Sequence, residues 1–123
     1  MKKPKLSEMQ TNELVDAFAG IGILQYNALD LGQIDKYNRL FKERIKIENE
    51  LKSRPGDERR ALKVLYGYPN MQVRLNAATA TLAVAPEAAR QLLEEIHTSQ
   101  WPPQALDAGM RLRNLDNGVF KPT

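Results

Sequence analysis

Hydrophobic residues recur along the chain at spacings of three and four, the period of helices that bury one face. Alternating runs of β-branched residues, which indicate strands, do not appear between turn signals. Breaking residues divide the chain into about six helical stretches, expected at residues 7–31, 33–53, 57–66, 71–85, 86–97 and 103–115. We therefore predict an all-α protein built of three antiparallel helical hairpins.

The first predicted helix begins at Ser7 or Thr11. Ser7 with Gln10 fits a capping box, in which polar side chains satisfy the free N–H groups of the first turn. Two adjacent apolar stripes give this helix a wide hydrophobic face, so we expect it to be well buried. Gly20 and Gly22 each cost about 1 kcal/mol in a helix interior. We expect close approach of another helix, or a local kink, to compensate.

Turn and cap residues set the ends of the other helices. Asp57 is expected to cap a short helix, and Asn70 the helix that follows it. Pro86 suits a first helical position, where a missing N–H is harmless. Asn117-Gly118 is expected to end the last helix with a left-handed residue.

The length of 123 residues suits one domain. We expect a long N-terminal hairpin over residues 7–53 and two shorter hairpins over 57–116. A flexible basic tail at 1–6 and a C-terminal tail at 117–123 flank them.

The excess positive charge lies at the N-terminus. The chain has 18 basic and 15 acidic residues, a net charge of +3 and a pI near 9.3. Lys2, Lys3 and Lys5 account for the whole excess, so the rest of the chain is neutral. A nucleic-acid footprint needs basic residues clustered on one face of the fold. We therefore expect a solvated tail, and the charge pattern disfavours nucleic acid as the partner.

The composition excludes several kinds of chemistry. The sequence has no cysteine and a single histidine, which excludes disulfides, thiolate metal sites, cysteine catalysis and multi-histidine metal sites. Gly20-Ile21-Gly22 follows no predicted strand, so the dinucleotide fingerprint fails. The apolar runs fall short of the ~20 residues of a membrane span, and no apolar segment follows the basic start as a signal peptide requires. We expect a non-enzymatic, cytoplasmic protein without cofactor, metal or membrane contact.

The run PNMQVRLNAATATLAVAP, from Pro69 to Pro86, resembles the second helix of a HEAT-type repeat. In that repeat a short turn leads into Val-Arg, two small residues and a leucine, here Val73, Arg74, Ala77, Ala78 and Leu82. The segments PEAARQLLEEI and PPQALDAGMRLRNL resemble a looser copy. Taken whole, the chain resembles a small bacterial family of HEAT-like domains catalogued as a domain of unknown function.

The resemblance implies a right-handed α-α superhelix with a protein-binding surface, and it implies no catalytic residue. It is specific over residues 57–116 and general over the N-terminal hairpin, which lacks the Val-Arg signature. The repeat spacing is also shorter than the ~40–47 residues of HEAT and armadillo units.

Two charged residues lie on the apolar face of the predicted helix 33–53. At 100° per residue its hydrophobic side chains, Tyr37 among them, share one arc, with Arg44 and Glu48 near the centre. These two are four positions apart and can meet. The pair either lines a polar pocket on the concave face or is a structural ion pair that fixes helix register. We favour the structural interpretation, because buried pairs need no ligand.

Three further residues have candidate roles. Arg74 is expected to anchor the adjacent turn through an acid or a carbonyl group, with Asn70 placed to offer a partner. Trp101 is expected either to cover the last hairpin or to stand exposed as an anchor for a partner, since tryptophan is enriched at interface hot spots. His97 is expected to interact with a helix dipole rather than to act in catalysis. The candidate binding residues are thus Tyr37, Arg44, Glu48, Arg74 and Trp101.

The predicted function is a protein-interaction module that presents a concave face to one protein or peptide. Two alternatives stay open: a HEAT-like protein that binds nucleic acid, and an immunity protein that neutralises a toxin. A third class is an enzyme or small-ligand binder with a pocket around Arg44 and Glu48. We expect a monomer or a weak homodimer, with the first helix as the contact in a dimer.

Overall fold

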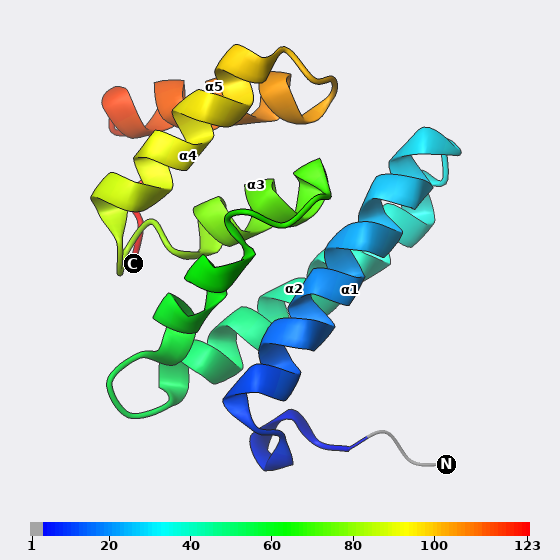
Figure 1. The fold of residues 1–123 in the computed structure, drawn as a ribbon, viewed down its shortest axis with the longest axis vertical. Helices are drawn as coiled ribbons and strands as arrows, with labels where there is room; N and C mark the ends of the chain where they lie inside the picture. Colours follow the sequence, from blue (N-terminus) through cyan, green and yellow to red (C-terminus); the bar gives the residue numbers. More distant parts are fainter. Residues whose placement is uncertain (1–3) are drawn as a thin grey trace.

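The structure is a computed structural model that describes residues 4–123, and this part of the chain contains helices but no strand (Figure 1). In chain order the elements are η1 (Leu6–Glu8), α1 (Thr11–Asp30), α2 (Ile34–Ser53), η2 (Glu58–Leu65), α3 (Met71–Ala80), α4 (Pro86–Ser99) and α5 (Gln104–Asp116). The prediction of an all-α protein is confirmed. Lys2 and Lys3 of the predicted tail lie outside the described residues, and the 3-10 helix η1 already begins at Leu6.

The helices form three stacked pairs. Helices α1 and α2 make a long antiparallel hairpin, η2 pairs with α3, and α4 pairs with α5 (Figure 1). Helix α3 is central, because it packs against α1 and η2 on one side and against α4 on the other. This stack of helix pairs has the superhelical arrangement predicted from the sequence.

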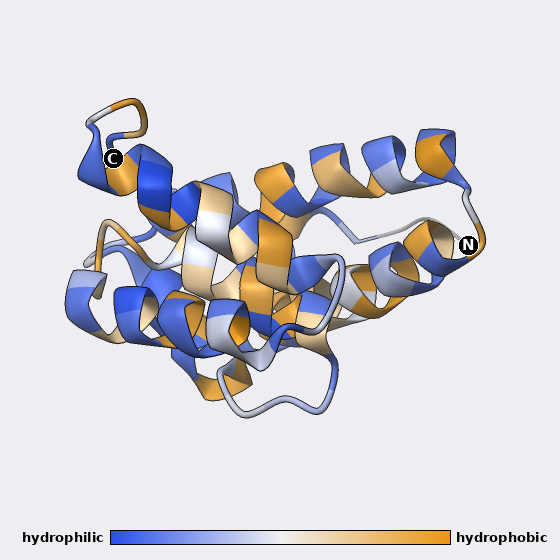
Figure 2. Cartoon of the chain, turned by 90° about the horizontal axis from the view of Figure 1, so that it is seen from above, coloured by the Kyte–Doolittle hydropathy of each residue, from blue (hydrophilic) through white to orange (hydrophobic). Residues whose placement is uncertain are grey.

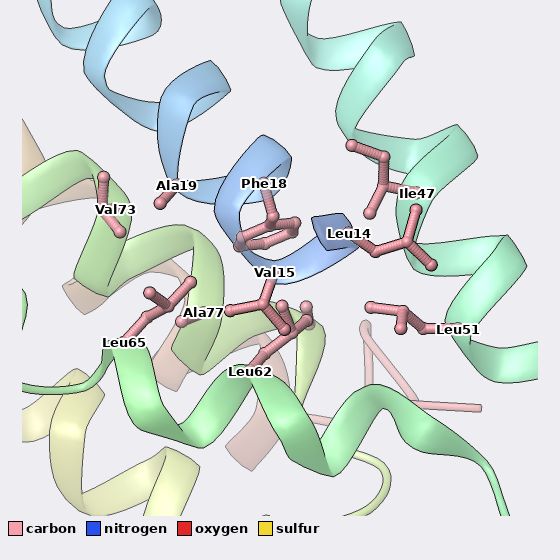
Figure 3. Close-up of a cluster of buried hydrophobic side chains, with 11 residues drawn as sticks. Leu14, Val15, Phe18, Ala19, Ile47, Leu51, Leu62, Leu65, Val73 and Ala77 are labelled. Atoms are coloured by element: carbon pink, nitrogen blue, oxygen red, sulfur yellow. The ribbon is translucent and has the colours of Figure 1, made fainter. Parts of the chain in front are cut away.

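Helix α3 separates two hydrophobic clusters. The first lies between α1, α2, η2 and α3, and its side chains from all four elements converge in Figure 3. The second lies between α3, α4 and α5. Val73 and Ala77 face the first cluster, whereas Leu75 and Ala78 face the second. Hydrophobic and hydrophilic residues alternate around the helices in Figure 2, as expected of helices that bury part of their surface.

Helix α1 begins at the second of its two predicted starts, and Asp57 caps the short helix after it as predicted. Ser7 belongs to η1, and α1 begins at Thr11 with Gln10 as its N-cap. The Gln10 backbone N–H donates to Oε1 of Glu13 at 2.9 Å, so the capping box predicted for Ser7 and Gln10 is wrong. The segment after Asp57 is a 3-10 helix, and the Asp57 side chain accepts from the Arg59 backbone N–H as its cap.

Helix α3 begins as predicted and ends earlier. The Asn70 side chain accepts from the backbone N–H groups of Gln72 and Val73 at 3.0 and 3.2 Å. The helix ends at Ala80 rather than at residue 85. The Thr81 hydroxyl donates to the carbonyl of Ala77 at 2.8 Å, and such local bonds compete with continuation of a helix.

Gly22 marks the closest approach of α1 and α3. A Cβ atom placed on Gly22 would lie 2.7 Å from Cγ2 of Val73 and 3.1 Å from its Cα. The predicted close approach of another helix is confirmed at this position. Gly20 has open space around it, so helix contact does not explain the glycine there.

Candidate functional site

A network of buried polar side chains joins four helices, and we call it the polar network. The Oδ1 atom of Asn76 in α3 accepts from Nη1 of Arg44 in α2 at 2.6 Å and from Nε2 of Gln72 at 2.9 Å. Its Nδ2 donates to Oε1 of Gln25 in α1 at 2.7 Å. The Nε2 of Gln104 in α5 donates to Oε1 of Gln72 at 3.0 Å. Asn76 is therefore the centre from which the network reaches the other three helices.

The Arg44–Glu48 pair on α2 forms the edge of this network. Nε of Arg44 lies 3.0 Å from Oε2 of Glu48, and Arg44 is only 4% exposed. The guanidinium carbon of Arg44 also lies 4.8 Å from the centre of the Phe41 ring. Because the guanidinium contacts an amide, a carboxylate and an aromatic face, its position is fixed by the fold.

Burial disfavours the charged forms of both Arg44 and Glu48. Loss of hydration raises the pKa of Glu48 above its ordinary value, although Arg44, Arg59 and Arg111 act in the opposite direction. Burial likewise lowers the pKa of Arg44, which Glu48 partly offsets. Glu48 therefore accepts a proton more readily than an exposed glutamate does.

The pair also lines a cavity of about 270 Å³, which we call the arginine cavity. Its wall includes residues of α2, η2, α3 and α5 and of the segment after α5. Arg59, Arg111 and Lys121 contribute further cationic groups to the wall, and Phe41 and Phe120 contribute apolar surface. The predicted ion pair is thus present, and both of its residues also line a cavity.

A second cavity of about 290 Å³ lies on α1, the start of α3 and the loop between α4 and α5. We call it the tryptophan cleft. Trp101 and Tyr26 stand beside each other in its wall, and Nε1 of Trp101 donates to the Tyr26 hydroxyl at 3.3 Å. Met71 and Arg74 of α3 also line it. Trp101 is 51% exposed, so it does not form a buried cover over the last hairpin.

Arg74 holds the turn before α3. Its Nε donates to the backbone carbonyl of Tyr68, as predicted for a carbonyl partner, whereas Asn70 serves as the helix cap.

Tyr37 is half-buried on α2 and lines neither cavity. His97 lies at the junction of α4 and α5, where its Nδ1 is 3.2 Å from the carbonyl oxygen of Ala105.

The sequence did not indicate the partners of these residues. Gln25, Gln72, Asn76 and Gln104 were not among the candidate residues, and each is at most 2% exposed. The spacing of Asn76 could have indicated that it is buried, because it lies three residues after Val73 and four before Ala80 on the apolar stripe of α3. The pairing of Tyr26 with Trp101 joins distant parts of the chain, and local pattern carries no signal for it.

Comparison with known families identifies the chain. The family described as "Domain of unknown function (DUF2019)" matches residues 12–116. The chain belongs to this family. The predicted membership of a small bacterial family of unknown function is thereby confirmed.

A solved structure is similar to this DUF2019 protein over nearly its whole length. The protein RPA1889 from Rhodopseudomonas palustris has 54% sequence identity, covering 98% of this chain and 100% of that one, with a TM-score of 0.94. Comparison with the curated proteins gave no match.

Two further findings concern the described part of the chain. None of its helices has both the length and the apolar character needed to cross a membrane. Within residues 4–123, no group of three or more histidine, cysteine, aspartate or glutamate side chains is arranged to hold a metal ion.

Proposed function

We propose that this DUF2019 protein is a HEAT-like protein-interaction module that binds one partner protein at the tryptophan cleft. The proposal takes it to be non-enzymatic and cytoplasmic, and to act as a monomer or weak homodimer. The observation that carries the proposal is the exposed Trp101, held beside Tyr26 by a hydrogen bond of 3.3 Å.

The residue types in the cleft support this proposal. Tryptophan, tyrosine, arginine and methionine are enriched at protein interfaces, and the first three dominate their hot spots. Here Trp101, Tyr26, Arg74 and Met71 line one cleft. They come from all of the stacked helix pairs, so the fold holds them in fixed relative positions. Such preorganisation lowers the entropic cost of binding.

The charge in the cleft indicates the chemistry of the partner. Arg74 is the charged residue of its lining, and it has no ion pair with the described residues. Its Nε already bonds to the Tyr68 carbonyl, which fixes the stem of the guanidinium. We therefore assign as occupant an extended segment that carries an apolar side chain for the Trp101–Tyr26 surface and a carboxylate for Arg74.

Site-specific crosslinking tests the proposal. A photoreactive amino acid at position 101 should capture one protein in cells of the source organism, and mass spectrometry should place the crosslink in an acidic, apolar segment. The matched control is the same amino acid at position 64, because Val64 is 76% exposed on η2 and lies outside the cleft. Equal capture from both positions, or no saturable partner at position 101, contradicts the proposal.

A further inference from the structure

Three arginines surround one carboxylate in the arginine cavity, and they come from different elements. Arg44 lies on α2, Arg59 on η2 and Arg111 on α5, and each acts electrostatically on Glu48. Lys121 adds a fourth cationic side chain from the segment after α5. Among the side chains of the wall, four are thus cationic and Glu48 is acidic, and α3, which is described in full, contributes no titratable side chain to it.

The arginines are held in place from outside the cavity. Nη2 of Arg59 lies 2.6 Å from Oδ2 of Asp57, and Nε of Arg111 lies 3.1 Å from Oδ1 of Asp107. Neither aspartate lines the cavity. Each of these side chains therefore has an anchoring carboxylate behind it, which orients the guanidinium without placing further negative charge in the wall.

We propose that the arginine cavity binds a small molecule bearing an oxyanion, a carboxylate or a phosphate, through Arg59, Arg111 and Lys121. Guanidinium groups match the paired oxygens of carboxylates and phosphates, which makes arginine the usual residue for such recognition. The volume of about 270 Å³ limits the ligand to a small molecule, and Phe41 and Phe120 offer apolar surface beside the charged groups. This site is distinct from the tryptophan cleft, and the inference does not depend on the proposed function.

Anion binding in the arginine cavity is coupled to protonation of Glu48. Its carboxylate lies in the same wall and would repel an incoming oxyanion if it stayed ionised. Arg44, Arg59 and Arg111 act electrostatically on Glu48, Lys121 lies in the same wall, and burial raises the pKa of the Glu48 carboxyl. Anion binding therefore includes uptake of a proton by Glu48, so affinity increases as the pH falls.

Isothermal titration with inorganic phosphate and with succinate tests this site. We expect saturable binding of at least one of them, and the preferred probe distinguishes a phosphate from a carboxylate ligand. Arg59→Gln and Arg111→Gln should each weaken binding about tenfold or more, as expected for loss of a charge-assisted hydrogen bond. The matched controls are Arg60→Gln and Arg113→Gln, because these neighbouring arginines are exposed and lie outside the cavity wall.

Glu48→Gln keeps the side-chain shape and provides an independent readout. This variant should bind the preferred probe more tightly than the wild type near neutral pH. It should also take up fewer protons on binding, as measured by titration in buffers of different ionisation enthalpy. Absence of saturable binding with both probes at millimolar concentration overturns the inference. Equal weakening in the control variants also overturns it, because it would show general attraction of anions to a basic surface.

Discussion

Nη1 of Arg44 donates to Oδ1 of Asn76 across 2.6 Å, and this bond joins the long N-terminal hairpin to the central helix α3. Both residues are at most 4% exposed. Asn76 also bonds to Gln25 and Gln72, so one amide connects α1 and α2 to α3. The polar network thus specifies how the hairpin docks, in addition to the nonspecific attraction of apolar surfaces.

Asn76→Ala should lower the free energy of unfolding by about 3–5 kcal/mol, because it leaves three buried polar groups without a partner. Those groups are Nη1 of Arg44, Nε2 of Gln72 and Oε1 of Gln25. Urea denaturation followed by circular dichroism measures the loss. Asn38→Ala is the control, since Asn38 is exposed on α2 and should change stability little. A loss of less than about 1 kcal/mol at Asn76 would show that the network is energetically neutral.

Arg44→Met should destabilise the protein by about 3 kcal/mol, because it removes the cation that contacts the buried Glu48 carboxylate. The double variant with Glu48→Leu should recover most of this loss, since an apolar pair of similar volume can replace a buried ion pair. Denaturant midpoints of the wild type, both single variants and the double variant give the coupling energy. A double variant no more stable than Arg44→Met would mean that the arginine acts mainly through Asn76.

Gly22→Ala should destabilise the fold by about 1–3 kcal/mol, because the new methyl group meets Val73, including its backbone. Gly20→Ala provides a matched comparison on the same helix. It should stabilise by about 0.5–1 kcal/mol, since nothing lies within 4 Å of its Cβ position and alanine favours a helix. Thermal melts of the two variants should therefore shift in opposite directions. Equal shifts would contradict the close contact of α1 and α3.

The raised pKa of Glu48 predicts a pH dependence of stability. Between the ordinary pKa of glutamate and the raised pKa, the folded state binds more protons than the unfolded state. The contribution of Glu48 to the free energy of unfolding is therefore present at low pH and decreases as the pH rises through that window. We expect the free energy of unfolding of the wild type, measured relative to Glu48→Gln, to decrease as the pH rises above the ordinary pKa of glutamate, about 4. An increase over this range would show that the surrounding arginines outweigh burial.

The positions of the helices were largely predictable, because local cap and turn residues determine where a helix begins and ends. Asn70 caps α3, Pro86 begins α4, and Gly118 adopts a positive φ of 76° after α5, all as the sequence indicates. The end of α3 was not predictable from apolar spacing, which continues past Ala80. There the Thr81 side chain also bonds to the Tyr66 hydroxyl, a tertiary contact that helix periodicity does not contain.

The candidate sites were predictable only in part. The position of Arg44 and Glu48 on an apolar arc indicated a buried pair, and the pair is present at 3.0 Å. Arg59 and Arg111 reach the same cavity from other helices, and their positions depend on how the pairs stack. A surface arginine and a cavity arginine look alike in a sequence, so the arginine cavity required the structure.

The most direct test of the central claim is the affinity with which the Trp101→Ala variant binds the partner segment. Removing an interface hot spot costs about 2 kcal/mol or more, so we expect its Kd to rise about 30-fold or more. Val64→Ala, which truncates an even more exposed apolar side chain outside the cleft, should bind like the wild type. An unchanged Kd for a folded Trp101→Ala variant would contradict the assignment of the tryptophan cleft as the partner-binding surface.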